Sequence, residues 1–122
     1  MTASDFRQYD YISHMIEAIE LARGYVEGMD KATFLADRRT QQAVIMNILI
    51  IGEAATKLAD RYPEFTLTHS QIAWNSMRGM RNRLAHGYFD INMDVVWETL
   101  ERDLPGLQES LTELRQRFLR DN

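Results

Sequence analysis

The sequence predicts an all-α fold, an up-and-down bundle of four to five helices. Apolar residues recur at steps of three and four along most of the chain, and no useful length of strand-like alternation appears. Only 2 Pro and 6 Gly occur among 122 residues, too few for a turn-rich β-sandwich. Because 45% of the residues are hydrophobic, the chain can bury a core, and we expect a single domain over residues 1–122.

The first half of the chain predicts two long helices joined by a short turn. The first follows a cap at Ser4 and runs to about Met29. Asp30 can cap the short turn. The second long helix spans roughly residues 38–61 and ends before Pro63. Because the middle of this second helix is apolar almost all round, we expect it to be buried on most sides.

The next predicted helix begins at a capping box. Thr68 is followed three residues later by Gln71, so the helix should begin near His69. It runs to about His86, and Gly87 suits the position just after a helix end.

The last helix is capped by Asn92 and has Asp94 in its first turn, where a carboxylate is favourable. Pro105 should kink or restart this helix, because it cannot donate a backbone hydrogen bond. The helical pattern continues to about Leu119.

Composition and hydropathy exclude several classes of protein. The chain has no Cys, which excludes disulfides, thiolate nucleophiles and zinc ribbons. Residues 1–10 lack the apolar region of a signal peptide. The longest apolar run, residues 43–51, is interrupted by Asn47 and is far shorter than the ~20 residues of a membrane helix. We therefore expect a cytoplasmic protein with no membrane partner.

Charge is distributed unevenly along the chain. The net charge of −4 argues against bulk nucleic-acid binding. Residues 65–89, however, contain no Asp or Glu, although Arg78, Arg81 and Arg83 lie within them. Arginine has the planar fork that suits phosphate. Chance clustering in an Arg-rich protein is the competing interpretation.

A polar stripe runs along the helix predicted inside this acid-free window. Arg78, Asn82 and His86 follow at steps of four, opposite the apolar side, and Arg81 lies at one edge of the stripe. Gly79 falls beside His86 and costs a helix ~1 kcal/mol relative to Ala. Its presence suggests close contact with a ligand or another chain. A plain solvated face is the alternative, but the three polar residues together favour a site.

The residue types in the stripe suit cleavage of RNA. Arginine can hold a phosphate and stabilise the charge that develops on it, and histidine can act as general acid or base. Metal-free cleavage needs a proton removed from a 2′-hydroxyl and another donated to the leaving 5′-oxygen. Because one His per chain fills one of these roles, a site shared between the two chains of a homodimer is expected.

Other chemistries have weaker support. His14 and Glu17 have metal-ligand spacing, but the order is reversed from the Glu-x-x-His pairs of a dimetal bundle, so we expect no metal site. The sequence has no phosphate-binding glycine loop and no convincing Ser/His/Asp set, and it indicates no cofactor. A DNA-reading helix-turn-helix is disfavoured by the acidic remainder of the chain.

The segment Arg81–Tyr88, RNRLAHGY, resembles the R-x4-H-x-Y motif of the HepT group of HEPN domains, with Asn82 as the polar residue that often follows the Arg. Further similarities occur in the family's order along nearly the whole chain. They are Gly52-Glu53-Ala54, Ala73-Trp74, Val95-Val96-Trp97 and Asp103-Leu104-Pro105. One departure is Ala73, where relatives often have Pro, and it affects the helix start rather than the chemistry.

The resemblance implies a HEPN fold and a homodimer in which the two motifs face each other. It implies the toxin of a type VII-like HepT/MNT toxin–antitoxin pair, a metal-independent ribonuclease. Arg81 and His86 would be catalytic, and Asn82 would orient or contact the phosphate, with Arg78 as a further phosphate ligand from the stripe.

The resemblance also implies a partner and a means of control. The partner would be an MNT-type nucleotidyltransferase antitoxin, bound in a larger hetero-oligomer, which adds AMP to Tyr88. The alternative is a noncatalytic HEPN subunit that binds nucleotide or scaffolds a nucleotidyltransferase. A complete pair of Arg81 and His86 favours the ribonuclease.

Overall fold

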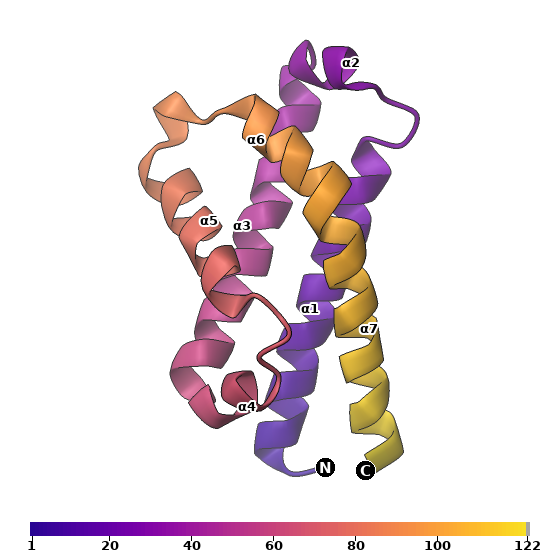
Figure 1. Ribbon diagram of the computed structural model, residues 1–122, viewed down its shortest axis with the longest axis vertical. Helices are drawn as coiled ribbons and strands as arrows, with labels where there is room; N and C mark the ends of the chain where they lie inside the picture. The colour runs from indigo at the N-terminus through magenta and orange to yellow at the C-terminus, as the bar shows by residue number, and fades with distance from the viewer. Residues whose placement is uncertain (122) are drawn as a thin grey trace.

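A computed structural model describes residues 1–121, and of Tyr88 it describes the backbone alone. Within these residues the chain forms helices and no strand, as predicted (Figure 1). The elements are α1 (Ala3–Tyr25), α2 (Lys31–Leu35), α3 (Arg38–Arg61), α4 (Pro63–Thr68), α5 (Trp74–His86), the 3-10 turn η1 (Tyr88–Asp90), α6 (Met93–Glu98), the π-helical segment η2 (Thr99–Asp103) and α7 (Leu104–Asp121).

The long helices lie side by side in the order α5, α3, α1, α7 (Figure 1). The short helices α2 and α4 close opposite ends of α3, and the two chain termini lie together at the α4 end. The core lies between these helices. Its largest fully buried side chains are Phe34, Ile12, Met15, Ile16, Ile19, Leu58, Leu100, Leu111, Val44 and Val96. Because α3 contacts both α1 and α5, it is the element on which α5 depends for its position.

The cap of α1 lies two residues before the predicted cap at Ser4. Thr2 is the cap, since the backbone N–H of Asp5 donates to the Thr2 hydroxyl over 3.1 Å. The backbone N–H of Thr2 in turn donates to the Asp5 carboxylate over 3.0 Å. This reciprocal pair satisfies two free donors, which Ser4 could not do. The helix also ends at Tyr25, short of the predicted Met29.

Helix α3 has the bounds predicted from the sequence. Asp37 caps it, accepting from the backbone N–H of Thr40 over 3.1 Å, and Asp30 caps α2 in the same way, as predicted. Helix α3 is long and apolar enough to cross a membrane by length and composition, but half of its most apolar stretch is buried in the bundle. A core helix of a globular protein passes the same test, so this feature carries little weight.

The segment between α3 and α5 differs from the prediction. The capping box at Thr68 and Gln71 is wrong, because Thr68 is the last residue of α4 and its hydroxyl donates to the Glu64 carbonyl over 2.8 Å. Pro63 occupies the first turn of α4, where its missing N–H is tolerated. Helix α5 begins only at Trp74, whose buried indole N–H donates to the carbonyl of His69 over 3.1 Å.

The last helix begins and is interrupted as the sequence predicted. Asn92 caps α6 and accepts from the backbone N–H groups of Asp94 and Val95. The interruption is the π-helical turn η2, in which the Leu104 N–H bonds to the Thr99 carbonyl. Because Pro105 cannot donate to a carbonyl in the preceding turn, the wider turn beside it relieves the mismatch.

Candidate functional site

Helices α3 and α5 approach closely at Gly52. A Cβ atom added to Gly52 would lie 2.4 Å from Cβ of Arg81 and 2.8 Å from the carbonyl oxygen of Met77. Real Cβ atoms do not approach other atoms so closely, so any side chain at Gly52 would push the helices apart. Glycine at this position therefore lets the arginines of α5 reach the polar groups of α3.

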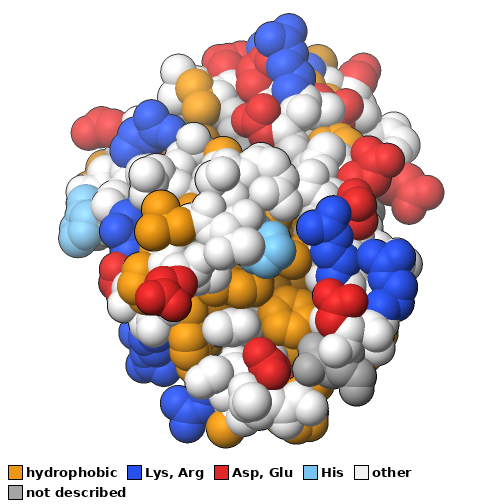
Figure 2. All heavy atoms as spheres, turned by 60° about the horizontal axis from the view of Figure 1, so that its bottom comes forward, with side chains coloured by type: hydrophobic (Ala, Val, Ile, Leu, Met, Phe, Trp, Pro, Cys, Tyr) orange, Lys and Arg blue, Asp and Glu red, His pale blue; other side chains and the backbone are white. Residues whose placement is uncertain are grey.

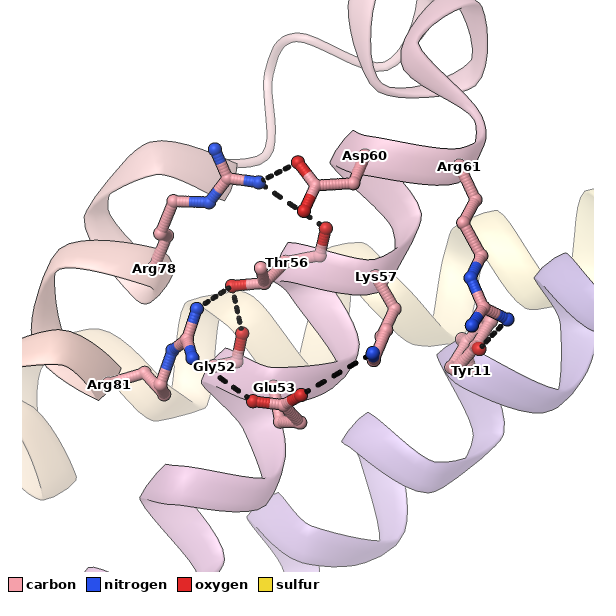
Figure 3. Close-up of polar contacts among 9 residues, drawn as sticks. All are labelled: Tyr11, Gly52, Glu53, Thr56, Lys57, Asp60, Arg61, Arg78 and Arg81. Atoms are coloured by element: carbon pink, nitrogen blue, oxygen red, sulfur yellow. Dashed lines mark hydrogen bonds and ion pairs between the residues drawn. The ribbon is translucent and has the colours of Figure 1, made fainter. Parts of the chain in front are cut away.

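Arg81 is fixed by two groups on α3 (Figure 3). Its Nη2 donates to the hydroxyl of Thr56 over 3.2 Å, and its Nη1 lies 3.3 Å from the carboxylate of Glu53. The side chain is 24% exposed. Its Nε is buried and has no acceptor within the described part of the chain, so the two terminal nitrogens set the direction of the guanidinium.

Arg78 contacts α3 one turn further along. Its Nη2 pairs with the carboxylate of Asp60 and donates over 3.4 Å to the carbonyl of Thr56 (Figure 3). The structure therefore corrects the predicted stripe, because Arg78 and Arg81 turn toward α3 rather than away from the core. A helical wheel of α5 alone cannot show this, since it contains neither the acceptors on α3 nor the space at Gly52.

The free face of α5 carries the other predicted site residues. Asn82 and His86 are exposed, and the side chain of His86, the last residue of the helix, makes no hydrogen bond or ion pair within the described residues. A Cβ at Gly79 would meet nothing within 4 Å, which leaves room for a ligand or another chain on this face. Tyr88 follows in η1, but its side chain lies outside the described part, so its predicted role stays a prediction.

Arg81 and His86 do not point to one place within a single chain. Five residues along an α-helix turn a side chain by about 140°. Arg81 accordingly faces α3, whereas His86 faces solvent. One chain therefore presents an anchored guanidinium and an exposed imidazole on different sides of the same helix.

A second histidine lies at the other end of the bundle. Apolar side chains gather on this end (Figure 2). The imidazole of His69 packs at a tilt against the ring of Phe65, with ring centres 4.8 Å apart, beside a cavity that Glu113 and Arg117 also line. Burial, and secondarily the charge of Arg117, lower the pKa of His69 below 6.5. Residues of α7 line the cavity beside it, and among the described residues His69 has no contact with the arginines of α5.

No metal-binding group forms within residues 1–121, since no three His, Asp or Glu side chains gather there. His14 and Glu17, the pair with metal-ligand spacing, lie exposed on α1.

Sequence reasoning missed two of the groups that hold the arginines, Thr56 and Asp60. They follow Gly52 at steps of four and therefore lie on one face of α3. That spacing was a usable signal that they share a face with Gly52. It does not show that this face contacts the arginines, because the packing of α5 against it has to be known first.

Comparison with known proteins identifies the family of the chain. The family model described as ribonuclease HepT-like matches residues 15–114, which include all of α3 and α5. The chain belongs to the ribonuclease HepT-like family.

Two curated relatives illustrate how far the family resemblance extends. A protein of Thermococcus cleftensis named "Probable ribonuclease HepT" is 36% identical over 107 residues, which cover 88% of this chain and 94% of the relative. A protein of Caldanaerobacter subterraneus subsp. tengcongensis named "Putative RNase" is 32% identical over 107 residues, covering 88% and 93%. No solved structure matches the chain.

Proposed function

We propose that this HepT-like protein is an endoribonuclease that cleaves RNA by metal-independent acid–base chemistry. The observation that carries the proposal is the contrast between two side chains of α5. Arg81 is anchored to α3, whereas the imidazole of His86, at the helix end, is exposed and has no polar partner among the described residues. A rigid cation suits stabilisation of a charged transition state, and an unpaired imidazole suits proton transfer. Membership of a family described as ribonucleases supports the same conclusion.

The proposed reaction is an in-line displacement at phosphorus. One His86 removes the proton from the 2′-hydroxyl as the 2′-oxygen attacks the phosphorus. The bond to the 5′-oxygen breaks, and a second His86 donates a proton to that oxygen, leaving a 2′,3′-cyclic phosphate. Arg81 stabilises the charge on the phosphorane, and Asn82 and Arg78 contact the phosphate.

We propose that the second His86 comes from a second copy of the chain. Arg78 pairs with Asp60, whereas Arg81, further along α5, meets Gly52, so α3 and α5 run antiparallel. The end of α5 that carries His86 therefore lies beside the α3 turns that precede Gly52. Those turns expose two apolar side chains, Met46 and Ile50, at 58% and 40%.

An exposed apolar pair beside a catalytic helix end is the feature expected of a subunit interface. We name Met46, Ile50, Ala85 and His86 the α3–α5 face. Dimerisation about a two-fold axis on this face would bring both His86 side chains to one RNA phosphate.

We further propose that the protein is the cytoplasmic toxin of a type VII-like pair with an MNT-type nucleotidyltransferase. Tyr88 lies two residues after His86, so AMP on its hydroxyl would place a phosphodiester charge where RNA must bind. Co-expression with the nucleotidyltransferase should add AMP to Tyr88 and stop RNA cleavage, as measured by intact mass and a cleavage assay. An unmodified but fully neutralised protein would mean that the antitoxin blocks the site by occupancy.

One observation favours a noncatalytic alternative. Arg78 and Arg81 are already paired with Asp60 and Glu53, as they would be in a scaffold that binds no RNA. Incubation of the purified protein with RNA in EDTA distinguishes the two functions. A ribonuclease yields fragments ending in 2′,3′-cyclic phosphate, whereas a scaffold leaves the RNA intact. Cleavage that requires added divalent metal would contradict the acid–base mechanism.

A further inference from the structure

We propose that Thr56 is a positioning residue that aims the Arg81 guanidinium at the reacting phosphate. The proposal rests on the ribonuclease function above. It adds a residue that lies outside the R-x4-H motif and touches neither RNA nor His86.

The Thr56 hydroxyl has a fixed direction. Thr56 is buried, with 8% of its surface exposed, and its hydroxyl donates to the carbonyl of Gly52 over 2.8 Å. Because the hydroxyl proton is used by this bond, the oxygen presents its lone pairs to the Nη2 of Arg81, 3.2 Å away. A β-branched side chain in a helix has few rotamers, so this acceptor moves little.

The other partner of Arg81 is less fixed. The Glu53 side chain is about half exposed, and the Nζ of Lys57 lies 3.9 Å from its second oxygen. Because solvent reaches this carboxylate, its ion pairs are weakened and another anion can displace it. Thr56 is therefore the partner that can hold Arg81 while Glu53 is displaced.

Thr56 also contacts the second arginine. Its carbonyl oxygen accepts from the Nη2 of Arg78 over 3.4 Å, so one residue touches both cations on α5 (Figure 3). The close approach at Gly52, one turn earlier on α3, brings the two helices near enough for these bonds. When a phosphate replaces Glu53 at Nη1 of Arg81, the bond from Nη2 to Thr56 keeps the guanidinium plane in place.

The test compares two substitutions at Thr56. Thr56→Val keeps the branched shape but removes the acceptor, and Thr56→Ser keeps the hydroxyl. We expect Thr56→Val to lower kcat for RNA cleavage by about 10- to 100-fold with little change in KM, since a misplaced catalytic group can cost about 100-fold. Thr56→Ser should restore most of the kcat.

The matched control is Thr66→Val. Thr66 is equally buried, but its hydroxyl bonds to the carbonyl of Pro63 at the start of α4 rather than to an arginine of α5. It should change Tm by about as much as Thr56→Val but leave kcat unchanged. A wild-type kcat in Thr56→Val would overturn the proposal, and a raised kcat would show that Thr56 restrains Arg81 instead.

A double-mutant cycle separates positioning from general damage. In an Arg81→Ala background, Thr56→Val should cause no further loss of kcat, because the group that it positions is gone. Additive losses would overturn the proposal. Wild-type protein that cuts no RNA would instead refute the ribonuclease function, so the two failures are distinguishable.

Discussion

The two proposed catalytic residues differ in how much structure depends on them. His86 is exposed and contacts no polar partner in the described residues, whereas Arg81 is partly buried and bonds to two groups on α3. A substitution at His86 therefore removes no polar contact between helices of the subunit, and light scattering checks that the proposed dimer is kept. A substitution at Arg81 does remove contacts between helices, so its effects on rate and on stability have to be measured separately.

At His86 we predict a large loss of rate without a loss of stability. His86→Ala should lower RNA cleavage by about 10²- to 10⁴-fold, the usual cost of losing a general acid or base. Its Tm should equal that of the wild type. Arg83→Ala is the matched control, because Arg83 is exposed on α5 and contacts the Met80 sulfur rather than α3. Equal cleavage by the His86 and Arg83 variants would contradict the assignment.

At His69 we predict a pH-dependent contribution to stability. Its folded-state pKa is lowered by burial and by Arg117, so the folded state binds a proton less readily than the unfolded state. The contribution is complete above about pH 6.5 and is lost as pH falls below that value.

The measurement is the Tm of wild type and His69→Gln across that range. The wild type should lose more Tm than the variant on acidification. His14→Gln, which removes an exposed imidazole, should follow the wild type. Parallel curves for the His69 variant and the wild type would show that the surroundings of His69 do not disfavour its protonation.

At the scale of elements, the sequence predicted correctly those helix bounds and caps that depend on neighbouring residues. The bounds of α3, the caps at Asp30 and Asn92 and the interruption at Pro105 follow from residues close in the chain. The segment before α5 could not be predicted in the same way. Thr68 satisfies a cap pattern and a helix end equally well, and what decides the start of α5 is the burial of Trp74 against the rest of the bundle.

In the candidate site, too, features set by nearby residues could be predicted and features set by distant residues could not. The motif identified Arg81 and His86, and the wheel correctly placed Asn82 and His86 on the free face. The direction of Arg81 depends on Thr56 and on the space at Gly52, which are 25 or more positions away in the chain. No pattern within α5 contains that information.

Substitution by alanine should have opposite effects on stability at two glycines that precede the motif. Gly52→Ala places a methyl group against the Arg81 side chain and the Met77 carbonyl, so α5 must shift, at a cost of about 1–3 kcal/mol. Gly79→Ala faces open space within α5 and should stabilise the chain by about 0.5–1 kcal/mol. Denaturant unfolding measures both changes. Equal stability of the two variants would mean that α3 and α5 are not closely packed at Gly52.

At the scale of the whole molecule, the proposed dimer explains why the motif is divided between two sides of α5. We predict that Met46→Glu, which places a charge in the α3–α5 face, yields a folded monomer that does not cut RNA. Leu67→Glu is the control, since Leu67 is 75% exposed on α4 at the other end of α3. Light scattering gives the oligomeric state. A monomeric wild type, or an active Met46→Glu monomer, would contradict the shared site.

A mixing experiment tests whether both His86 side chains serve one site. If acid and base come from different subunits, a dimer of one wild-type and one His86→Ala chain is inactive. After subunit exchange in an equal mixture, a two-fold dimer leaves about a quarter of the pairs fully wild type, so cleavage should fall to about a quarter of that of the same total of wild-type chains. Chains that each carry a complete site would retain about half, as would the mixture before exchange. The ratio therefore measures how many histidines one cleavage requires, with no assumption about where the interface lies.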